Sequence, residues 1–258
     1  MWVEANGLRI FYEEFGSGPP LVLLHGGTNT GRGEWERCIP LFAARFRTIV
    51  PDSRGHGRTA NPSDHLRYRQ MADDVAAFTA ALGLDRPVIC GWSDGGQIAL
   101  EIGIEHPESA SLLIAGGVLF RHSGQYLAEA RRFLHADQHA RVDHERLERE
   151  SPETVEWLRR HEQSGGSWKR HISAVAGLWL KPFNLTPERF ARIQTPTLLV
   201  LGDRDAAIPL VEVTDMLTLI PDAELAVIPG ADHSIPFSRA ETFASIVDDF
   251  VDRRSGRE

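Results

Sequence analysis

Residues 87–100, PVICGWSDGGQIAL, decide the fold of this 258-residue chain. The stretch opens on a short apolar run, which is typical of a strand buried on both faces, and it ends in a run with helical preference. Between them, residues 91–95 match the pattern G-x-S-x-G. Glycines on either side of Ser93 relieve crowding in a sharp strand-to-helix turn, which leaves the serine hydroxyl exposed above the sheet. The stretch predicts a serine nucleophile; the alternative is a glycine-rich turn with an incidental serine.

The same alternation of strand and helix extends outward in both directions. At the start, Asn6-Gly7 is a favourable type I′ turn and predicts a hairpin between residues 3–5 and 8–15. The further predicted strands are 21–24, 47–50, 88–91, 111–115, 197–202 and 224–228. The predicted helices are 34–44, 69–82, 97–105, 211–219 and 240–253. Strands that alternate with helices predict an α/β fold with parallel pairing and helices on both faces of the sheet.

The alternation stops between about residues 120 and 181. This segment is charged, rich in His and Arg, and helical in period, with a break at Ser164-Gly165-Gly166 and an end at Lys181-Pro182. We therefore expect a discontinuous core of residues 1–119 and 186–258, with a helical insertion at 120–185.

Composition excludes several classes of protein. With 28 basic and 36 acidic residues the net charge is −8, which disfavours nucleic acid or an anionic membrane as partner. Cys38 and Cys90 form neither a disulfide framework nor a cysteine-based zinc site. The first residues lack the pattern of a signal peptide, and no apolar stretch approaches the ~20 residues that span a bilayer. We expect a soluble cytoplasmic enzyme.

A serine nucleophile needs a general base, and the base needs an orienting acid. Eleven histidines compete for the role of base, and His233 is favoured because it follows the last predicted strand. Acid candidates lie in Gly202-Asp203-Arg204-Asp205, directly after another strand. The carboxyl ends of parallel strands share one edge, where α/β sheets bind ligands, so these groups and Ser93 are expected to meet there.

A backbone site for the developing oxyanion is also predicted. His25-Gly26-Gly27 follows the apolar strand 21–24, and its small residues let the Gly27 N–H approach the reacting carbonyl. The Asp94 N–H, at the start of the predicted helix, is the second expected donor.

Together these motifs resemble the α/β-hydrolase-fold serine hydrolases over essentially the whole chain. The residues that carry the resemblance are HGG at 25–27, DSRGHGRT at 52–59, GWSDGG at 91–96, GDRD at 202–205 and GADHS at 230–234. It implies a mostly parallel eight-stranded sheet, a helical lid at 120–185 and a triad of Ser93, Asp205 and His233. In that family the acid ends a G-x-x-D turn, which selects Asp205 over Asp203. Thr59 departs from the family pattern, which has Ser there.

Asp94 is the most informative departure from the common family pattern, which has an uncharged residue after the nucleophile. A carboxylate beside a developing oxyanion hinders catalysis unless a cation offsets it. The motif GWSDGG is similar to that of the biphenyl-hydrolase-like (valacyclovir hydrolase) branch, in which this Asp recognises an α-amino group. The resemblance implies that Asp94 binds substrates with an amine in the acyl part. The alternative is that Asp94 caps the following helix or points away from the site.

Other patterns are weaker. Residues 26–33 lack the Lys and the Ser or Thr of a phosphate-binding loop. His135 and His139 stand four apart on a predicted helix, but no third metal ligand is apparent. Residues 141–160 predict an exposed helical face with i,i+4 ion pairs. Three tryptophans and a phenylalanine of the insertion are expected to pack or to line an acyl pocket: Trp157, Trp168, Trp179 and Phe183.

These observations predict a serine hydrolase of small carboxylic esters, with aminoacyl esters or amides as the finer expectation. It would need no cofactor or metal and would act on a small molecule as a monomer or homodimer. Alternatives with the same triad are a lactonase, a perhydrolase and a C–C bond hydrolase. A rival from another class is a ligand receptor that keeps the fold without catalysis. Haloalkane and epoxide hydrolysis are disfavoured, because both use Asp where this chain has Ser93.

Overall fold

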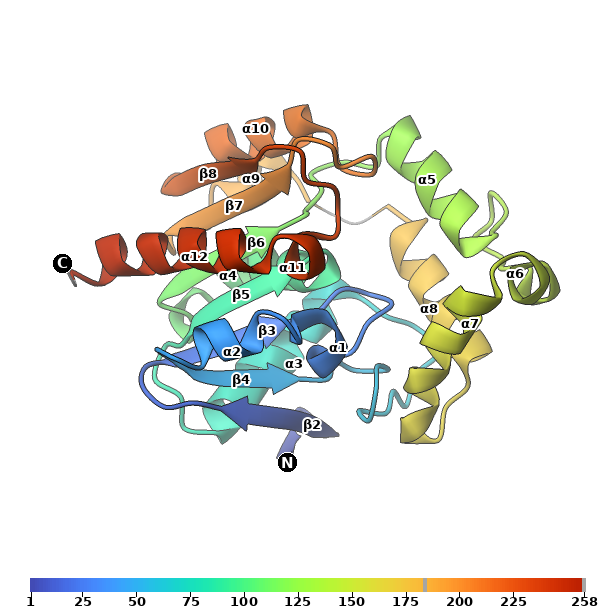
Figure 1. The fold of residues 1–258 in the computed structure, drawn as a ribbon, viewed down its shortest axis with the longest axis horizontal. Helices are drawn as coiled ribbons and strands as arrows, with labels where there is room; N and C mark the ends of the chain where they lie inside the picture. Colours follow the sequence, from blue (N-terminus) through green and yellow to red (C-terminus); the bar gives the residue numbers. More distant parts are fainter. Residues whose placement is uncertain (183–184, 257–258) are drawn as a thin grey trace.

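The computed structural model describes residues 1–182 and 185–256. Its centre is an eight-stranded sheet with the strand order β1-β2-β4-β3-β5-β6-β7-β8 (Figure 1). The strands are β1 (Trp2–Ala5), β2 (Leu8–Phe15), β3 (Pro20–Leu24), β4 (Arg47–Pro51), β5 (Val88–Trp92), β6 (Leu112–Gly116), β7 (Thr197–Gly202) and β8 (Ala223–Ile228). From β4 to β8 neighbouring strands are parallel, whereas β2 is antiparallel to both β1 and β4. The predicted α/β fold with a mostly parallel sheet is confirmed.

The N-terminal hairpin forms as the Asn6-Gly7 pair predicts. Both residues have positive φ angles, 49° and 71°, which a type I′ turn requires. The second strand of the hairpin then pairs with β4, where Tyr12 lies opposite Pro51. The hairpin therefore extends the parallel sheet at one edge.

Helices cover both faces of the sheet (Figure 1). One face is covered by α1 (Gly31–Trp35), α2 (Ile39–Phe42), α11 (Ile235–Ser238) and α12 (Ala240–Ser255). The other carries α3 (Tyr68–Ala81), α4 (Asp94–Glu105), α9 (Pro187–Phe190) and α10 (Leu210–Leu219), and η1 (Pro107–Ser109) follows α4. Phe243 of α12 is fully buried against the rings of Trp35, Phe42 and Trp92. Truncating such a side chain to Ala typically costs about 3–5 kcal/mol of stability.

The single helix expected over residues 34–44 is wrong. The structure has two short helices there, α1 and α2, separated by a turn. Pro40 lies in the first turn of α2. It has no N–H to donate to the carbonyl of Glu36, and its ring would clash with that carbonyl in a continuous helix.

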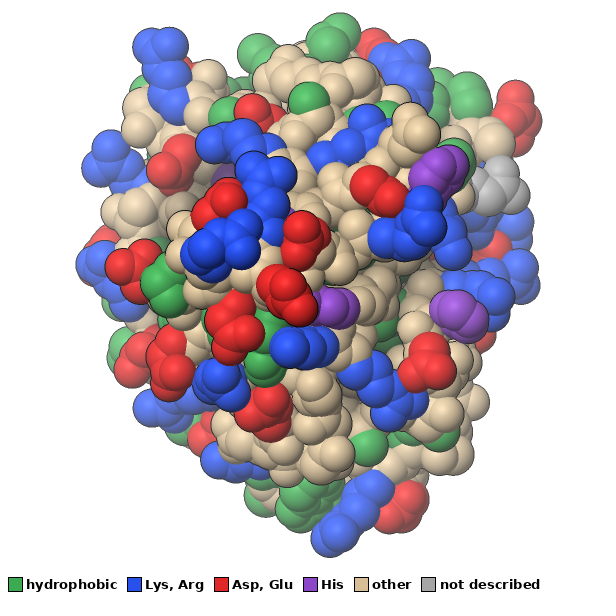
Figure 2. Space-filling model, turned by 90° about the vertical axis from the view of Figure 1, so that its right-hand side faces the viewer, with side chains coloured by type: hydrophobic (Ala, Val, Ile, Leu, Met, Phe, Trp, Pro, Cys, Tyr) green, Lys and Arg blue, Asp and Glu red, His purple; other side chains and the backbone are tan. Residues whose placement is uncertain are grey.

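The helical insertion lies between β6 and β7 along the chain. It consists of α5 (Gly124–Leu134), α6 (His144–Glu150), α7 (Pro152–Leu158), η2 (Arg159–Ser164) and α8 (Trp168–Trp179). These helices gather on one side of the core (Figure 1), and Figure 2 faces that side, where basic and acidic side chains intermingle. An i,i+4 pair of the expected kind joins Arg146 to Glu150 at 2.9 Å. Phe183 lies outside the described residues.

The expectation that His135 and His139 share a helix is wrong. Helix α5 ends at Leu134, and His135 takes a left-handed φ of 48° as its C-cap. His139 lies in the turn that follows. The two rings therefore do not have the i,i+4 relationship that a common metal ion would need on a helix.

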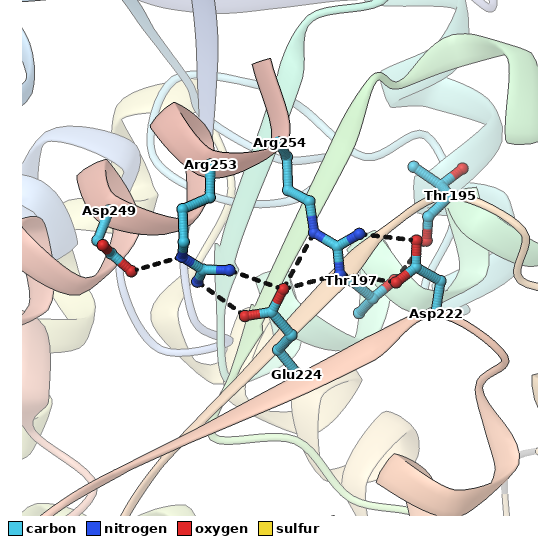
Figure 3. Close-up of polar contacts among 7 residues, drawn as sticks. All are labelled: Thr195, Thr197, Asp222, Glu224, Asp249, Arg253 and Arg254. Carbon is cyan, nitrogen blue, oxygen red and sulfur yellow. Dashed lines mark hydrogen bonds and ion pairs between the residues drawn. The ribbon is translucent and has the colours of Figure 1, made fainter. Parts of the chain in front are cut away.

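An ion-pair network fastens the end of α12 to the edge strand β8 (Figure 3). The Glu224 carboxylate accepts hydrogen bonds from Arg253 at 2.8 Å and Arg254 at 2.7 Å, and Arg254 also binds Asp222 at 2.7 Å. These side chains are partly exposed, so each pair contributes at most about 1 kcal/mol. Charged groups on an edge strand also discourage pairing with other strands. Among the helices described, none is long and apolar enough to cross a membrane.

Candidate active site

Ser93 occupies a sharp turn between β5 and α4. Its backbone angles, φ 55° and ψ −118°, are strained for a residue with a side chain. A Cβ atom on Gly91 would overlap the carbonyl oxygen of Gly95, and one on Gly95 would overlap the carbonyl oxygen of Leu24. Both glycines of the motif are therefore required by close backbone contacts. The Ser93 N–H donates to Gly116 O at 2.8 Å, which holds the turn against β6.

The register of the sheet brings the four candidate loops together. Leu24 pairs with Gly91, so the loops that follow β3 and β5 leave the sheet side by side. Gly202 pairs with Ile228, so the loops that follow β7 and β8 also leave the sheet side by side. All four loops lie at the carboxyl edge of the parallel strands, where ligands bind in this fold class.

Asp205 and His233 form a directly bonded pair. His233 Nδ1 lies 2.7 Å from Asp205 Oδ2, and the Asp205 side chain is completely buried. Its other oxygen, Oδ1, accepts the backbone N–H groups of Ala207 at 2.9 Å and Ile208 at 3.0 Å. A carboxylate only accepts hydrogen bonds, so Nδ1 carries the ring proton and Nε2 is the basic atom of a neutral His233.

The surroundings of His233 favour its protonated form. Burial lowers its pKa, but the hydrogen bond and charge of Asp205, with the charges of Glu34 and Asp94, outweigh burial and raise the pKa above its ordinary value. The indole N–H of Trp92 donates to the His233 carbonyl at 2.9 Å and fixes the loop. No hydrogen bond joins Ser93 Oγ to His233 among the described residues, although both line one cavity. Such bonds often form fully only with substrate bound.

Asp203, the other acid of the GDRD turn, has a different role. Its Oδ1 accepts the N–H of Gly230 at 2.6 Å, which ties the loop after β7 to the loop after β8. The structure therefore brings Asp205, and not Asp203, to the imidazole of His233.

The backbone N–H groups of Gly27 and Asp94 are free to bind a ligand. Asp94 is the first residue of α4, so its N–H has no acceptor within the helix, and Gly27 lies in a turn. Within residues 1–182 and 185–256 neither N–H has another backbone or side-chain acceptor. The neighbouring Gly26 N–H is occupied, because it donates to Glu34 Oε2 at 3.1 Å.

The Asp94 carboxylate points toward Gly27 and does not cap α4. A Cβ atom on Gly27 would overlap Asp94 Oδ2. Asp94 Oδ1 accepts hydrogen bonds from the Tyr68 hydroxyl at 2.7 Å and from Trp179 Nε1 at 2.8 Å. Burial raises the pKa of Asp94 to about 6, although these two donors partly offset the effect. Of the orientations left open by the sequence, the structure has the one directed into the site.

A second buried acid, Glu34, lies on the other side of the same loop. Its Oε2 accepts from Gly26 N at 3.1 Å and from Asn29 Nδ2 at 3.2 Å. Burial raises its pKa to about 7. No sequence pattern identifies Glu34, because it lies in a short helix eight residues from Gly26, which it contacts.

The candidate residues line a cavity of about 720 Å³, a size suited to a small molecule. Aromatic side chains from the insertion form part of its wall: Tyr126, Phe133, Trp157 and Trp179. Acidic side chains outnumber arginines in its lining, with Glu34, Asp94, Glu129, Glu153, Asp205 and Asp232 against Arg132 and Arg204. The core side of the cavity therefore carries Glu34, Asp94 and Asp205, whereas the insertion side combines these aromatic rings with Glu129, Glu153 and Arg132.

Two of the three tryptophans singled out from the sequence line this cavity. Trp157 and Trp179 do, whereas Trp168 is buried within the insertion. Tyr68, which binds Asp94, carried no recognisable signal in the sequence. Among the described residues, no group of three His, Cys, Asp or Glu side chains is arranged to hold a metal ion.

Known proteins resemble this chain in sequence and in fold. The sequence profile of the alpha/beta hydrolase family matches residues 21–246. The chain belongs to the alpha/beta hydrolase family. This α/β hydrolase is similar to a 2-hydroxy-6-oxo-6-(2'-aminophenyl)hexa-2,4-dienoic acid hydrolase of Metapseudomonas resinovorans, with 28% identity over 98% of this chain and 91% of the relative. A bifunctional esterase/perhydrolase of Acinetobacter calcoaceticus is 24% identical over 92% and 94% of the two chains.

The fold of this α/β hydrolase is also found in solved structures. A thermophilic esterase from Thermogutta terrifontis superposes with a TM-score of 0.77 over 98% of this chain and 99% of the esterase, at 23% identity. At that identity the likeness establishes the fold.

Proposed function

We propose that this α/β hydrolase is a serine hydrolase of small carboxylic esters that works through an acyl-enzyme. The observation that carries the proposal is the 2.7 Å bond between His233 Nδ1 and Asp205 Oδ2 at the cavity that Ser93 lines. The bond sets the tautomer in which Nε2 can accept a proton.

In the proposed reaction, Ser93 Oγ attacks the ester carbonyl carbon while its proton passes to His233 Nε2. The carbonyl π electrons move to oxygen to give a tetrahedral oxyanion. When the oxyanion collapses, the bond to the alkoxy group breaks, and His233 returns the proton to the departing alcohol. Water then attacks the acyl-enzyme with His233 as base, which releases the carboxylic acid and restores Ser93. Asp205 stabilises the imidazolium throughout.

The N–H groups of Gly27 and Asp94 are proposed to bind the oxyanion. Their lack of acceptors in the described chain supports this role. Loss of one such donor typically costs about 3–4 kcal/mol of transition-state stabilisation.

The finer proposal is that the preferred substrates are esters or amides with an amino group in the acyl part. The buried Asp94 carboxylate beside Gly27 and the acidic lining of the cavity support it. So does the resemblance of residues 91–96 to the biphenyl-hydrolase-like branch. An ammonium group would offset the charge of Asp94 where it otherwise opposes the oxyanion. We propose that helices α5–α8 act as the lid, since their aromatic side chains line the cavity.

The test compares the wild type with Ser93→Ala and Ser255→Ala. Ser255 is exposed at the end of α12 and serves as the matched control. We expect Ser93→Ala to lose both ester hydrolysis and labelling by a fluorophosphonate, whereas Ser255→Ala retains both. Labelling that persists in Ser93→Ala would refute the proposed nucleophile. Tight binding of small ligands without turnover by the wild type would instead indicate a receptor.

A second candidate is hydrolysis of a C–C bond next to a ketone with the same residues. It is favoured by the 28% identity to the Metapseudomonas resinovorans hydrolase, which is named for 2-hydroxy-6-oxo-6-(2'-aminophenyl)hexa-2,4-dienoic acid. Incubation with a 6-aryl-6-oxo-dienoic acid and chromatography of the released arenecarboxylic acid would measure this activity. The ratio of kcat/KM for that compound to kcat/KM for small esters and lactones decides between the candidates.

A further inference from the structure

His25, which directly precedes Gly26 and Gly27, fixes the loop that carries Gly27 on the side of the core. The Gly26 carbonyl accepts hydrogen bonds from His25 Nδ1 at 2.8 Å and from Asn29 N at 3.1 Å. Ser53 N donates to His25 Nε2 at 2.9 Å, so the His25 proton is on Nδ1. The Gly26–Gly27 peptide is planar and trans, so fixing its carbonyl also fixes the direction of the Gly27 N–H on the opposite side.

The next part of the loop is held from the insertion. The Thr28 carbonyl accepts hydrogen bonds from Trp157 Nε1 at 2.7 Å and from His161 Nε2 at 3.3 Å. Gly57 N donates to His161 Nδ1 at 3.0 Å, so Nε2 carries the proton that His161 donates. Trp157 lies in α7 and His161 in η2, whereas Gly57 belongs to the core.

His25 and His161 belong to a cluster of four buried histidines. His25 and His56 come from the core, and His161 and His171 come from the insertion. Ring centroids lie 4.9 Å apart for His25 and His56, 4.7 Å for His56 and His171, and 3.7 Å for His161 and His171. His56 Nε2 also lies 2.9 Å from the carbonyl oxygen of Gly27. The cluster joins the insertion to the loop, and its members are exposed by at most 6%.

We propose that Trp157 and His161 are positioning residues that set the Gly27 N–H for the oxyanion, so that the loop has its working shape only while the insertion is docked. The proposal rests on the proposed function, because it assigns the oxyanion to Gly27. Trp157 also lines the cavity, so one side chain both encloses the substrate and orders the loop. Enclosure of the substrate and assembly of the oxyanion site thereby occur together.

The alternative role for these contacts is only to satisfy a carbonyl group and to stabilise the fold. If that were their role, removing the contacts would leave unchanged how much more tightly the enzyme binds the transition state than the ground state. The discriminating quantity is therefore the inhibition constant of an alkylboronic acid, which forms a tetrahedral adduct with the serine, relative to that of the carboxylic acid product, which forms none.

The experiment replaces Trp157 by Phe and, separately, by 3-benzothienylalanine, which keeps the bicyclic shape but lacks the N–H. Trp168→Phe is the matched control, because Trp168 is buried in the same insertion and its indole N–H has no acceptor among the described residues. We expect both Trp157 variants to lower kcat by about tenfold or more with little change in KM. The inhibition constant of the boronic acid should rise by the same factor, and that of the product should stay constant. The control should change none of these quantities.

Two results would overturn the inference. One is unchanged kcat in the benzothienylalanine variant, and the other is a rise in KM alone, which would make Trp157 only a wall of the cavity. The proposed function fails separately, if Ser93→Ala keeps its turnover or its fluorophosphonate label. The isosteric variant keeps the test valid if Trp157→Phe does not fold.

Discussion

The carboxylate of Asp94 accepts a 2.7 Å hydrogen bond from the hydroxyl of Tyr68 and, within the described chain, pairs with no cationic side chain. It is 4% exposed and directly follows Ser93. Its hydrogen-bond donors, Tyr68 and Trp179, are neutral, and the charge of a protonated His233 acts on it without a direct bond. A buried negative charge with that environment is well placed to bind an ammonium group.

Asp94→Asn is expected to remove the preference for amine-bearing esters. It should lower kcat/KM for an alanyl ester by about tenfold to a hundredfold, the usual range for a charge-assisted hydrogen bond, and leave the propionyl ester nearly unchanged. Glu153→Gln is the control, since Glu153 lines the cavity but is exposed. Equal effects of Asp94→Asn on both esters would exclude recognition by charge.

The same preference should depend on pH. Burial raises the pKa of Asp94 to about 6, so the carboxylate becomes charged as the pH rises through that value. A substrate α-amino group loses its proton near 7.7–8.0. The ratio of kcat/KM for alanyl over propionyl esters should therefore peak between about pH 6 and 7.7. Tyr68→Phe removes a donor that lowers the pKa of Asp94, so it should move the acid side of this peak to higher pH. A flat ratio across this range would contradict the assignment.

Glu34 should raise the pKa of the His233 imidazole. Its charge is one of the causes that raise the pKa of His233. Glu34→Gln retains an acceptor for the Gly26 N–H, so it should lower the pKa of His233 and move the acid limb of kcat/KM for an uncharged ester to lower pH. Glu129→Gln, at the cavity wall, should leave the limb in place. A shift in the opposite direction would show that Glu34 acts other than by charge.

The buried histidines predict a loss of stability in mild acid. Burial lowers the pKa of His25 to about 4 and that of His56 to about 3, and it lowers the pKa values of His161 and His171 as well. An unfolded histidine takes up its proton near pH 6.5, so the folded state binds fewer protons below that pH. Stability present above pH 6.5 is therefore lost as the pH falls toward 4, at about 1.4 kcal/mol per unit for each histidine.

Urea unfolding at several pH values would measure this slope. The raised pKa values of Asp94 and Glu34 act in the opposite direction over part of the range, so slopes are compared between variants. His171→Phe should reduce the slope by about one proton, or about 1.4 kcal/mol per unit. The exposed His65→Gln should not change it. An unchanged slope in His171→Phe would contradict the neutral cluster.

The sequence predicted those features that local rules determine. The glycines around Ser93, the Asn6-Gly7 turn and the strand ends before Asp205 and His233 all follow from backbone sterics and sheet topology. The positions of Tyr68 and Glu34 at the site could not be predicted from the sequence, because they depend on how helices pack around the loop after β3. Contacts of Trp157 and His161 with Thr28 depend on how the insertion docks, which no local pattern encodes.

Two local predictions failed for identifiable reasons. The helix expected over residues 34–44 is interrupted because Pro40 has no N–H to donate to the preceding turn. This proline is visible in the sequence and could have predicted the interruption. The helix expected to carry His135 ends at Leu134 and closes with His135 itself in a left-handed conformation. Residues other than glycine seldom have a positive φ, although histidine does so more often than most, so the sequence alone does not predict this helix end.

Detection of the acyl-enzyme tests most directly whether Ser93 is the nucleophile. The protein is mixed with p-nitrophenyl acetate, quenched in acid within the first turnover and digested for peptide mass spectrometry. We expect an acetyl group on the peptide that contains Ser93, and its absence in Ser93→Ala. Turnover of the ester with no acetyl group on Ser93, or with the group on another residue, would contradict it.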